Sequence, residues 1–175
     1  MNTEKEISVQ IIKSFNKTDL ADLCDITEQA INNGGGFGWL KLPPRETLNN
    51  YWKGTLLVPN RKVVVGRINN VIAGSLQIIL KPKNNEAQQN IANITSHFVA
   101  PWARGYGLAK KMIDVAENTA LELGSNCIHL DVRETQDAAI KLFESKGYIK
   151  WGTNPIYAFI NGKVLKGVFY YKMLK

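Results

Sequence analysis

The first half of the chain alternates between the apolar period of strands and that of helices. Apolar residues at every second position over 7–11 predict a first strand. A helical period starting at Asp19, a candidate N-cap, runs to 31 and ends at the glycine run 34–36. A shorter helical pattern covers 46–53. The segment therefore predicts one strand followed by two helices.

Three strands are predicted next. The segments 62–68 and 71–80 are apolar and flank Asn69-Asn70, a pair that tolerates the positive φ of a tight hairpin turn. Apolar residues alternate again over 90–99, before Pro101. These strands are expected to lie side by side in one sheet.

The second half of the chain predicts a helix, a strand and a further helix. One apolar face over 108–123, ended by Gly124, predicts a long helix, and 127–132 predicts a short strand. A further helix is expected between Thr135, a candidate cap, and Gly147.

The tail offers two strands, 157–160 and 168–173, joined through the turn pair Asn161-Gly162. The element order predicts a single α/β (α+β) domain over 1–175, with a mixed, mostly antiparallel sheet of about seven strands flanked by about four helices.

Composition narrows the class of protein. With 175 residues, 45% hydrophobic and 21% charged, the chain has an ordinary globular balance. Its two cysteines, Cys24 and Cys127, form neither a disulfide framework nor a zinc-binding spacing, so no metal is expected. Its apolar runs fall short of the ~20 residues of a membrane span, and MNTEKE is no signal peptide. We expect a soluble, cytoplasmic protein.

The net charge is +7, from 22 Lys and Arg against 15 Asp and Glu. A basic surface attracts anions, of which nucleic acid, acidic membrane and a polyanionic cofactor are the main classes. Composition alone does not distinguish them.

The segment FVAPWARGYGLAKK, residues 98–111, leads from a strand through a glycine turn into a helix. The first amides of a helix have no backbone partner and carry partial positive charge, so they bind phosphate oxygens. Gly105 and Gly107 would let those amides approach an anion, and Arg104 and Lys110 add charge. The segment is a candidate phosphate site.

Three known anion-binding patterns match this segment only in part. A dinucleotide fingerprint would need glycine at Lys110, and a Walker loop would need GK followed by Ser or Thr. RGYG at 104–107 matches the opening of an RNA-binding motif, but the aromatic continuation is missing. RNA recognition is the weaker alternative.

The pattern R-x-x-G-x-A, met by Arg104, Gly107 and Ala109, follows a strand ending Phe-Val-x-Pro. This resembles the pyrophosphate-binding segment of the GCN5-related N-acetyltransferase (GNAT) family. IHLDVRE and DAAIKLFESKGY further along are similar to the next strand and helix of that family. More narrowly, SLQIILKPKNNEAQQNIANI and the tail resemble the small bacterial branch that includes tabtoxin-resistance acetyltransferase.

The resemblance implies that two central parallel strands, 93–99 and 127–132, splay apart and admit the pantetheine arm of acetyl-CoA. Gln136 and Phe143 stand where many relatives have an asparagine and a tyrosine near the cofactor. The implied cofactor-binding residues are Phe98, Val99, Arg104, Gly105, Tyr106, Gly107, Leu108, Ala109, Lys110, Gln136 and Phe143.

The resemblance leaves the acid and base open. Because Phe143 replaces the tyrosine that protonates the leaving thiolate, Tyr148, another tyrosine (Tyr157, Tyr170 or Tyr171) or solvent must serve. An ammonium with pKa near ~10.4 must lose a proton before it attacks. Asp131 is the first candidate base, with Glu134 and His129 nearby. Asp131 also fits a structural role at a strand end.

Aromatic residues near the first helices, Phe37 and Trp39, are implied to shape the acceptor pocket, although core packing explains them too. Tyr157 and Asn93 are assigned to the same pocket, and His97 alternates with Asn93 so that both could face the substrate. The glycine-rich segment 34–38 is a candidate lid.

We therefore expect an acetyl-CoA-dependent N-acetyltransferase that acts on the amine of a small molecule by direct attack in a ternary complex. A covalent route through Cys127 lacks any signal for an activated thiolate. The alternatives are a non-catalytic acyl-CoA sensor and an RNA-binding module. No membrane partner is expected, and a homodimer is one further expectation.

Overall fold

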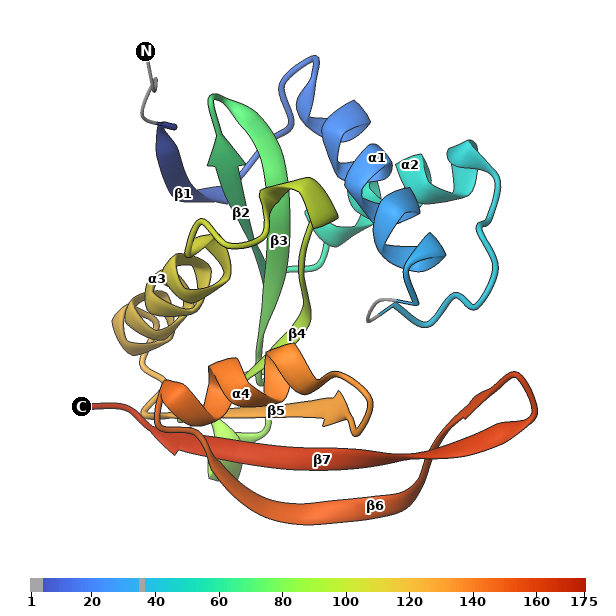
Figure 1. Cartoon of the computed structure of the whole chain (residues 1–175). Helices are drawn as coiled ribbons and strands as arrows, with labels where there is room; N and C mark the ends of the chain where they lie inside the picture. The colour runs from blue at the N-terminus through green and yellow to red at the C-terminus, as the bar shows by residue number, and fades with distance from the viewer. Residues whose placement is uncertain (1–4, 35–36) are drawn as a thin grey trace.

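The computed structural model describes residues 5–34 and 37–175, and over these residues seven strands form one mixed sheet in the order β1-β2-β3-β4-β5-β7-β6 (Figure 1). The strands are β1 (Ile7–Ile12), β2 (Arg61–Ile68), β3 (Val71–Leu80), β4 (Ile91–Val99), β5 (Cys127–Arg133), β6 (Ile149–Ile160) and β7 (Lys163–Met173). The α-helices are α1 (Asp19–Asn32), α2 (Arg45–Thr55), α3 (Leu108–Glu122) and α4 (Asp137–Ser145). The predicted fold class is confirmed.

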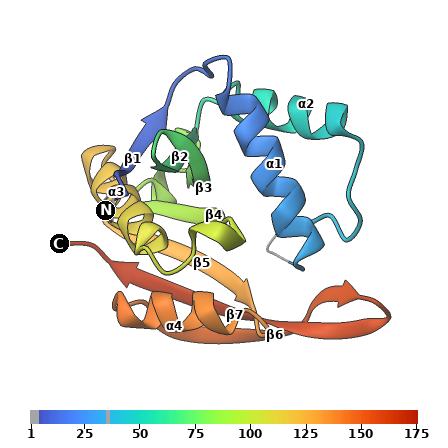
Figure 2. The ribbon, with the colours of Figure 1, turned by 45° about the horizontal axis from the view of Figure 1, so that its top comes forward.

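The helices form two layers. In two views α1 and α2 lie on one side of the central strands and α3 on the other, while α4 covers β5 and β7 (Figure 2). None of these helices, within the residues that the structure describes, combines the length and apolar composition needed to cross a bilayer.

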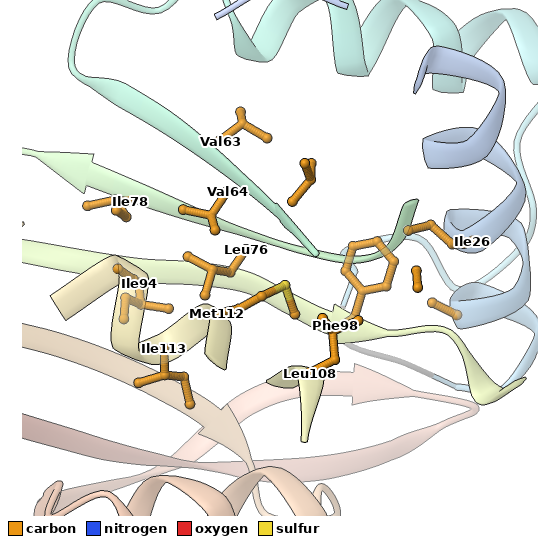
Figure 3. Packing of buried hydrophobic residues seen from close by; sticks show 14 of the residues in the cluster. Ile26, Val63, Val64, Leu76, Ile78, Ile94, Phe98, Leu108, Met112 and Ile113 are labelled. Atoms are coloured by element: carbon orange, nitrogen blue, oxygen red, sulfur yellow. The ribbon is translucent and has the colours of Figure 1, made fainter. Parts of the chain in front are cut away.

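The core under α3 fixes the start of that helix. Apolar side chains of α3 pack against β2, β3 and β4. Figure 3 shows Leu108 and Met112 of α3 together with Leu76 of β3. A Cβ at Gly66 would lie 2.6 Å from the Leu108 side chain, so the first turn of α3 sits directly on strand β2. Close packing makes this position costly to shift.

The sheet opens between its two parallel strands. β4 and β5 pair only at Ile91–Cys127, Ala92–Ile128 and Asn93–His129, although both strands continue. β5 stays paired with β7 along its whole length. The predicted splay between the two central strands is therefore confirmed.

A β-bulge in β4 changes which side chains face the opening. The β3–β4 register shifts between Ser75 and Gln77, and Ser96 has a φ of 51°. A bulge of one residue sends the following side chains to the opposite face. Asn93 and His97 therefore do not share a face, and the expectation that they alternate toward one substrate is wrong.

Two predicted caps are also wrong. Thr18 precedes α1, while the Asp19 carboxylate turns inward and accepts a 2.7 Å hydrogen bond from the buried Arg67. Gln136, not Thr135, occupies the N-cap of α4, and its side chain makes no capping bond. The Asp19 and Gln136 side chains instead make long-range contacts, Asp19 with Arg67 and Gln136 with the Gly34 carbonyl.

The tail strands are longer than predicted, since β6 begins at Ile149 and β7 at Lys163. β6 is an edge strand whose side chains are exposed or half-buried throughout, so no apolar alternation marks its first half. The predicted turns are confirmed, with positive φ at Asn69, Asn70, Asn161 and Gly162.

Candidate active site

A cavity of about 980 Å³ lies where β4 and β5 diverge. Its walls come from 94–99 of β4, 130–133 of β5, the first turns of α4 and 157–160 of β6, with Phe37 on the α1 side. It reaches from Arg104 and Ala109 at the start of α3 to Asp131 on β5. The cavity therefore runs through the sheet between its two helical layers.

The start of α3 offers free main-chain donors. Gly107 is the N-cap with φ 74°, Gly105 has φ 84°, and no side chain among residues 5–34 and 37–175 caps the helix. The amides of 105–110 make no hydrogen bond to any of the residues that the structure describes. A Cβ at either glycine would meet no atom of the described residues within 4 Å, so these residues leave the corner open. Such a corner fits a diphosphate.

The strand edge of β4 supplies further donors. The Ala100 amide donates to Ala73 of β3 at 2.8 Å. Because antiparallel strands alternate the side on which they bond, the main-chain groups of Val99 point away from β3, toward the gap. Phe98, in register with Ser75, points its own groups toward β3. Of these two predicted residues, therefore, only Val99 has main-chain groups that are directed into the gap and available to a ligand.

Asp131 and Tyr157 meet in the cavity. The Tyr157 hydroxyl donates a hydrogen bond to Asp131 Oδ2, and its ring lies over Gly167 of β7. Burial, and then the bond to Asp131, raise the pKa of Tyr157 well above its usual range. The phenol therefore stays protonated and holds one carboxylate oxygen in place.

Arg133 and Gln136 bridge to the α1 side. An Arg133 guanidinium N–H donates to the Phe37 carbonyl at 2.8 Å, and Gln136 Nε2 donates to the Gly34 carbonyl at 3.3 Å. The centre of the candidate lid, Gly35 and Gly36, lies outside the described residues. Arg133 was not among the predicted site residues, although its place two positions after Asp131 signals a shared strand face.

His97 also lines this cavity. Its ring packs 5.7 Å from Phe143, and its Nε2 atom is buried without a partner among the described residues. Burial lowers the pKa of His97 to about 4. The imidazole is therefore neutral at physiological pH. Phe143 itself lines the cavity and is buried.

Three of the predicted catalytic and substrate-binding residues, Glu134, Asn93 and Tyr148, do not line this cavity. Glu134 accepts a 2.9 Å bond from the Lys166 amide, and Asn93 accepts one from Lys81 Nζ at 2.9 Å. Tyr148 is buried beyond Phe143, where burial raises its pKa. The structure does not bring these three side chains to Asp131.

Four further predicted positions also lie outside the lining of the main cavity. Trp39 lines a second cavity of about 230 Å³, which shares Arg133 with the first. Tyr106 is exposed and accepts a 2.7 Å hydrogen bond from Lys5 Nζ. Leu108 is buried, and Lys110 is exposed in the first turn of α3.

A sheet opened between two parallel strands, with free amides at the next helix start, is the arrangement expected of an acyltransferase that uses an acyl-CoA donor. The model of the acetyltransferase (GNAT) family matches residues 22–148. The chain is 47% identical over 131 residues to an uncharacterized N-acetyltransferase encoded in the hisH-hisA intergenic region of Azospirillum brasilense, covering 75% of this chain and 78% of that protein. The chain therefore belongs to the GNAT family and is an acetyl-CoA-dependent N-acetyltransferase.

Solved structures share the fold. An N-acetyltransferase from Staphylococcus aureus superposes with a TM-score of 0.81 at 20% identity, covering 97% of this chain and 99% of its own. The yncA protein of Salmonella typhimurium, described as an acetyltransferase and solved with its cofactor acetyl-CoA, gives 0.78 at 17% identity, covering 97% and 94%.

Proposed function

We propose that this enzyme transfers the acetyl group of acetyl-CoA to the amine of a small molecule by direct attack within a ternary complex. The observation that carries the proposal is the continuous cavity from Arg104 and Ala109, beside the free amides of α3, to Asp131 on the other side of the splay. Donor and acceptor can reach it from opposite faces of the sheet.

In this proposal the amides of 105–110 and the Arg104 side chain hold the diphosphate, and the main chain of Val99 holds the pantetheine arm. Acetyl-CoA supplies the reactive thioester when it is bound. The open space around Gly105 and Gly107 supports this fit, because no side chain of the described residues occupies it.

Asp131 is assigned as the group that takes a proton from the acceptor's ammonium group before the resulting neutral amine attacks. One of its oxygens is fixed by Tyr157, and the carboxylate remains exposed to the cavity. A neutral amine is then presented to the thioester carbonyl. Positioning of the carboxylate by Tyr157 keeps its free oxygen directed at the acceptor.

The departing thiolate is expected to leave with help from solvent. Phe143 has no proton to give, and of the four candidate tyrosines only Tyr157 lines the cavity, with a raised pKa. A thiol with pKa of ~8.5 is already a good leaving group. Burial raises the pKa of the Cys127 thiol, which disfavours a covalent intermediate there.

Two measurements on the purified chain test the proposal. Calorimetric titration with acetyl-CoA should give a Kd of tens of micromolar or tighter, and a thiol-release screen should then show turnover with a subset of small amines. Absence of acetyl-CoA binding would reject the proposal. Binding without thiol release from any amine would instead favour an acyl-CoA sensor.

Two finer expectations stay predictions. One is membership in the small branch that includes tabtoxin-resistance acetyltransferase. The other is a homodimer, which is consistent with the exposed apolar side chains of the edge strand β6, among them Trp151, Ile156 and Phe159.

A further inference from the structure

We infer that the acceptor amine carries a carboxylate on the same carbon as its nitrogen or on the adjacent one, and that Arg133 binds that carboxylate while Asp131 receives the amine. This inference rests on the proposed function, because it names the substrate class of the same site. It makes Arg133 a specificity-determining residue.

Asp131 and Arg133 stand on one face of β5. The strand alternates buried Leu130 and Val132 with the more exposed Asp131 and Arg133, and both charged residues line the cavity. Residues two apart on one strand face are separated by about 6.7 Å along the strand. A negative and a positive group at that spacing match the opposite charges of an amino-acid zwitterion.

The Arg133 guanidinium has donors left over. No carboxylate lies within 4.0 Å of it among the residues that the structure describes. One terminal N–H group donates to the Phe37 carbonyl, which fixes the direction of the planar fork. A guanidinium carries about five N–H donors, so several remain for a ligand oxygen.

The proposed donor does not require this cation. The diphosphate is assigned to Arg104 and the amides at the start of α3, whereas Arg133 is at the carboxyl end of β5, facing Phe37. Tyr157 occupies one oxygen of Asp131 and leaves the other for the amine. An amine without a carboxylate would leave the half-buried Arg133 without an anionic partner, which disfavours its binding.

The test compares substrate pairs that differ only in the carboxylate. L-phenylalanine is compared with 2-phenylethylamine, and L-leucine with 3-methylbutylamine, by thiol release with wild type and Arg133→Gln. The variant should lower kcat/KM for the amino acids by roughly tenfold or more and leave the simple amines nearly unchanged. Differences in amine basicity cancel, because each substrate is compared between two proteins.

Controls separate charge from folding. Lys150→Gln removes an exposed cation on the opposite face of the same sheet, in register with Tyr170, and should leave the amino-acid preference intact. Arg133→Lys should keep part of the preference, and acetyl-CoA titration of Arg133→Gln should match wild type. In wild type, 3-phenylpropionate should compete with L-phenylalanine, a test that needs no variant.

Equal losses for both members of a pair in Arg133→Gln, or a wild type that uses only amines without a carboxylate, would overturn the inference and leave the proposed function standing. Failure of acetyl-CoA binding, or of thiol release with every amine, would instead remove the proposed function itself.

Discussion

The ring of Tyr157 lies directly on the backbone of Gly167, and this contact places the tyrosine hydroxyl on Asp131. The two residues belong to adjacent strands, with Tyr157 in an irregular stretch of β6 between Asn154 and Ala158. A Cβ at position 167 would overlap the ring. The absence of a side chain on β7 therefore sets the orientation of a carboxylate on β5.

Gly167→Ala should reproduce the effect of Tyr157→Phe. Both changes remove the hydrogen bond to Asp131, the first by displacing the ring and the second by deleting the hydroxyl, and each should lower kcat/KM by roughly tenfold. Steady-state thiol release measures it. Gly152→Ala on β6 is the matched control, because its Cβ would meet no atom of the residues that the structure describes within 4 Å. Wild-type rates in Gly167→Ala would show that the contact does not matter for turnover.

Asp131→Asn should lower kcat/KM by roughly 10²- to 10⁴-fold at neutral pH. The amide oxygen still accepts the Tyr157 hydroxyl, so the fold should be preserved, but the variant lacks a carboxylate to take the proton. The deficit should narrow as the pH rises toward the amine pKa of ~10.4, where the acceptor is already neutral. A pH profile of both proteins measures this, and a constant deficit at all pH values would argue against a role as base.

Gly107→Leu should weaken acetyl-CoA binding by roughly tenfold or more, since a large side chain would cover the free amides of α3. Gly124→Leu is the matched control, because Gly124 at the other end of α3 also has a positive φ, of 88°, and open space around it. Both should lose stability to a similar degree, about 1–2 kcal/mol. Calorimetric titration with acetyl-CoA should distinguish the two variants, with weaker binding in Gly107→Leu only. Equal affinities would show that the start of α3 is not part of the binding site.

His97 should make stability depend on pH in a defined window. Its pKa of about 4 in the folded chain lies below the ordinary value of 6.5, so the unfolded chain binds more protons between these values. The neutral His97 side chain contributes its full share of the free energy of unfolding above pH 6.5. That share, about 3 kcal/mol in all, is lost as the pH falls toward 4. Urea unfolding at pH 7 and pH 4.5 should therefore show a smaller acid-induced loss in His97→Leu than in wild type. Parallel losses would contradict an imidazole that stays neutral in the folded chain.

Local signals predicted much of the fold. The turn pairs Asn69-Asn70 and Asn161-Gly162 have the positive φ that their residue types tolerate, and the apolar face of α3 packs as its period indicates. The glycine corner before α3 was predictable because glycines, a basic residue and a helical period are contiguous in sequence.

Long-range features left no such signal. The bulge at Ser96 adds one residue without any change in apolar pattern, yet it decides where His97 points. The bond from Arg133 to Phe37 joins residues 96 positions apart, and the seat of Tyr157 on Gly167 depends on strand register. The spacing of apolar residues predicts the secondary structure of one segment. These contacts depend on how segments that are far apart in the sequence pack together, which that spacing does not predict.

The three residue pairs that join β4 to β5 have a consequence for cooperativity. They are the only β-ladder link between the two halves of the sheet within the described part of the chain. Amide hydrogen exchange can distinguish units that open separately, and a narrow seam of this kind favours such behaviour. A molecule bound across the opening contacts both halves, so occupancy of the site should raise protection in β5 and β7 as well as in β4. Binding of acetyl-CoA should in this way stabilise the enzyme against unfolding.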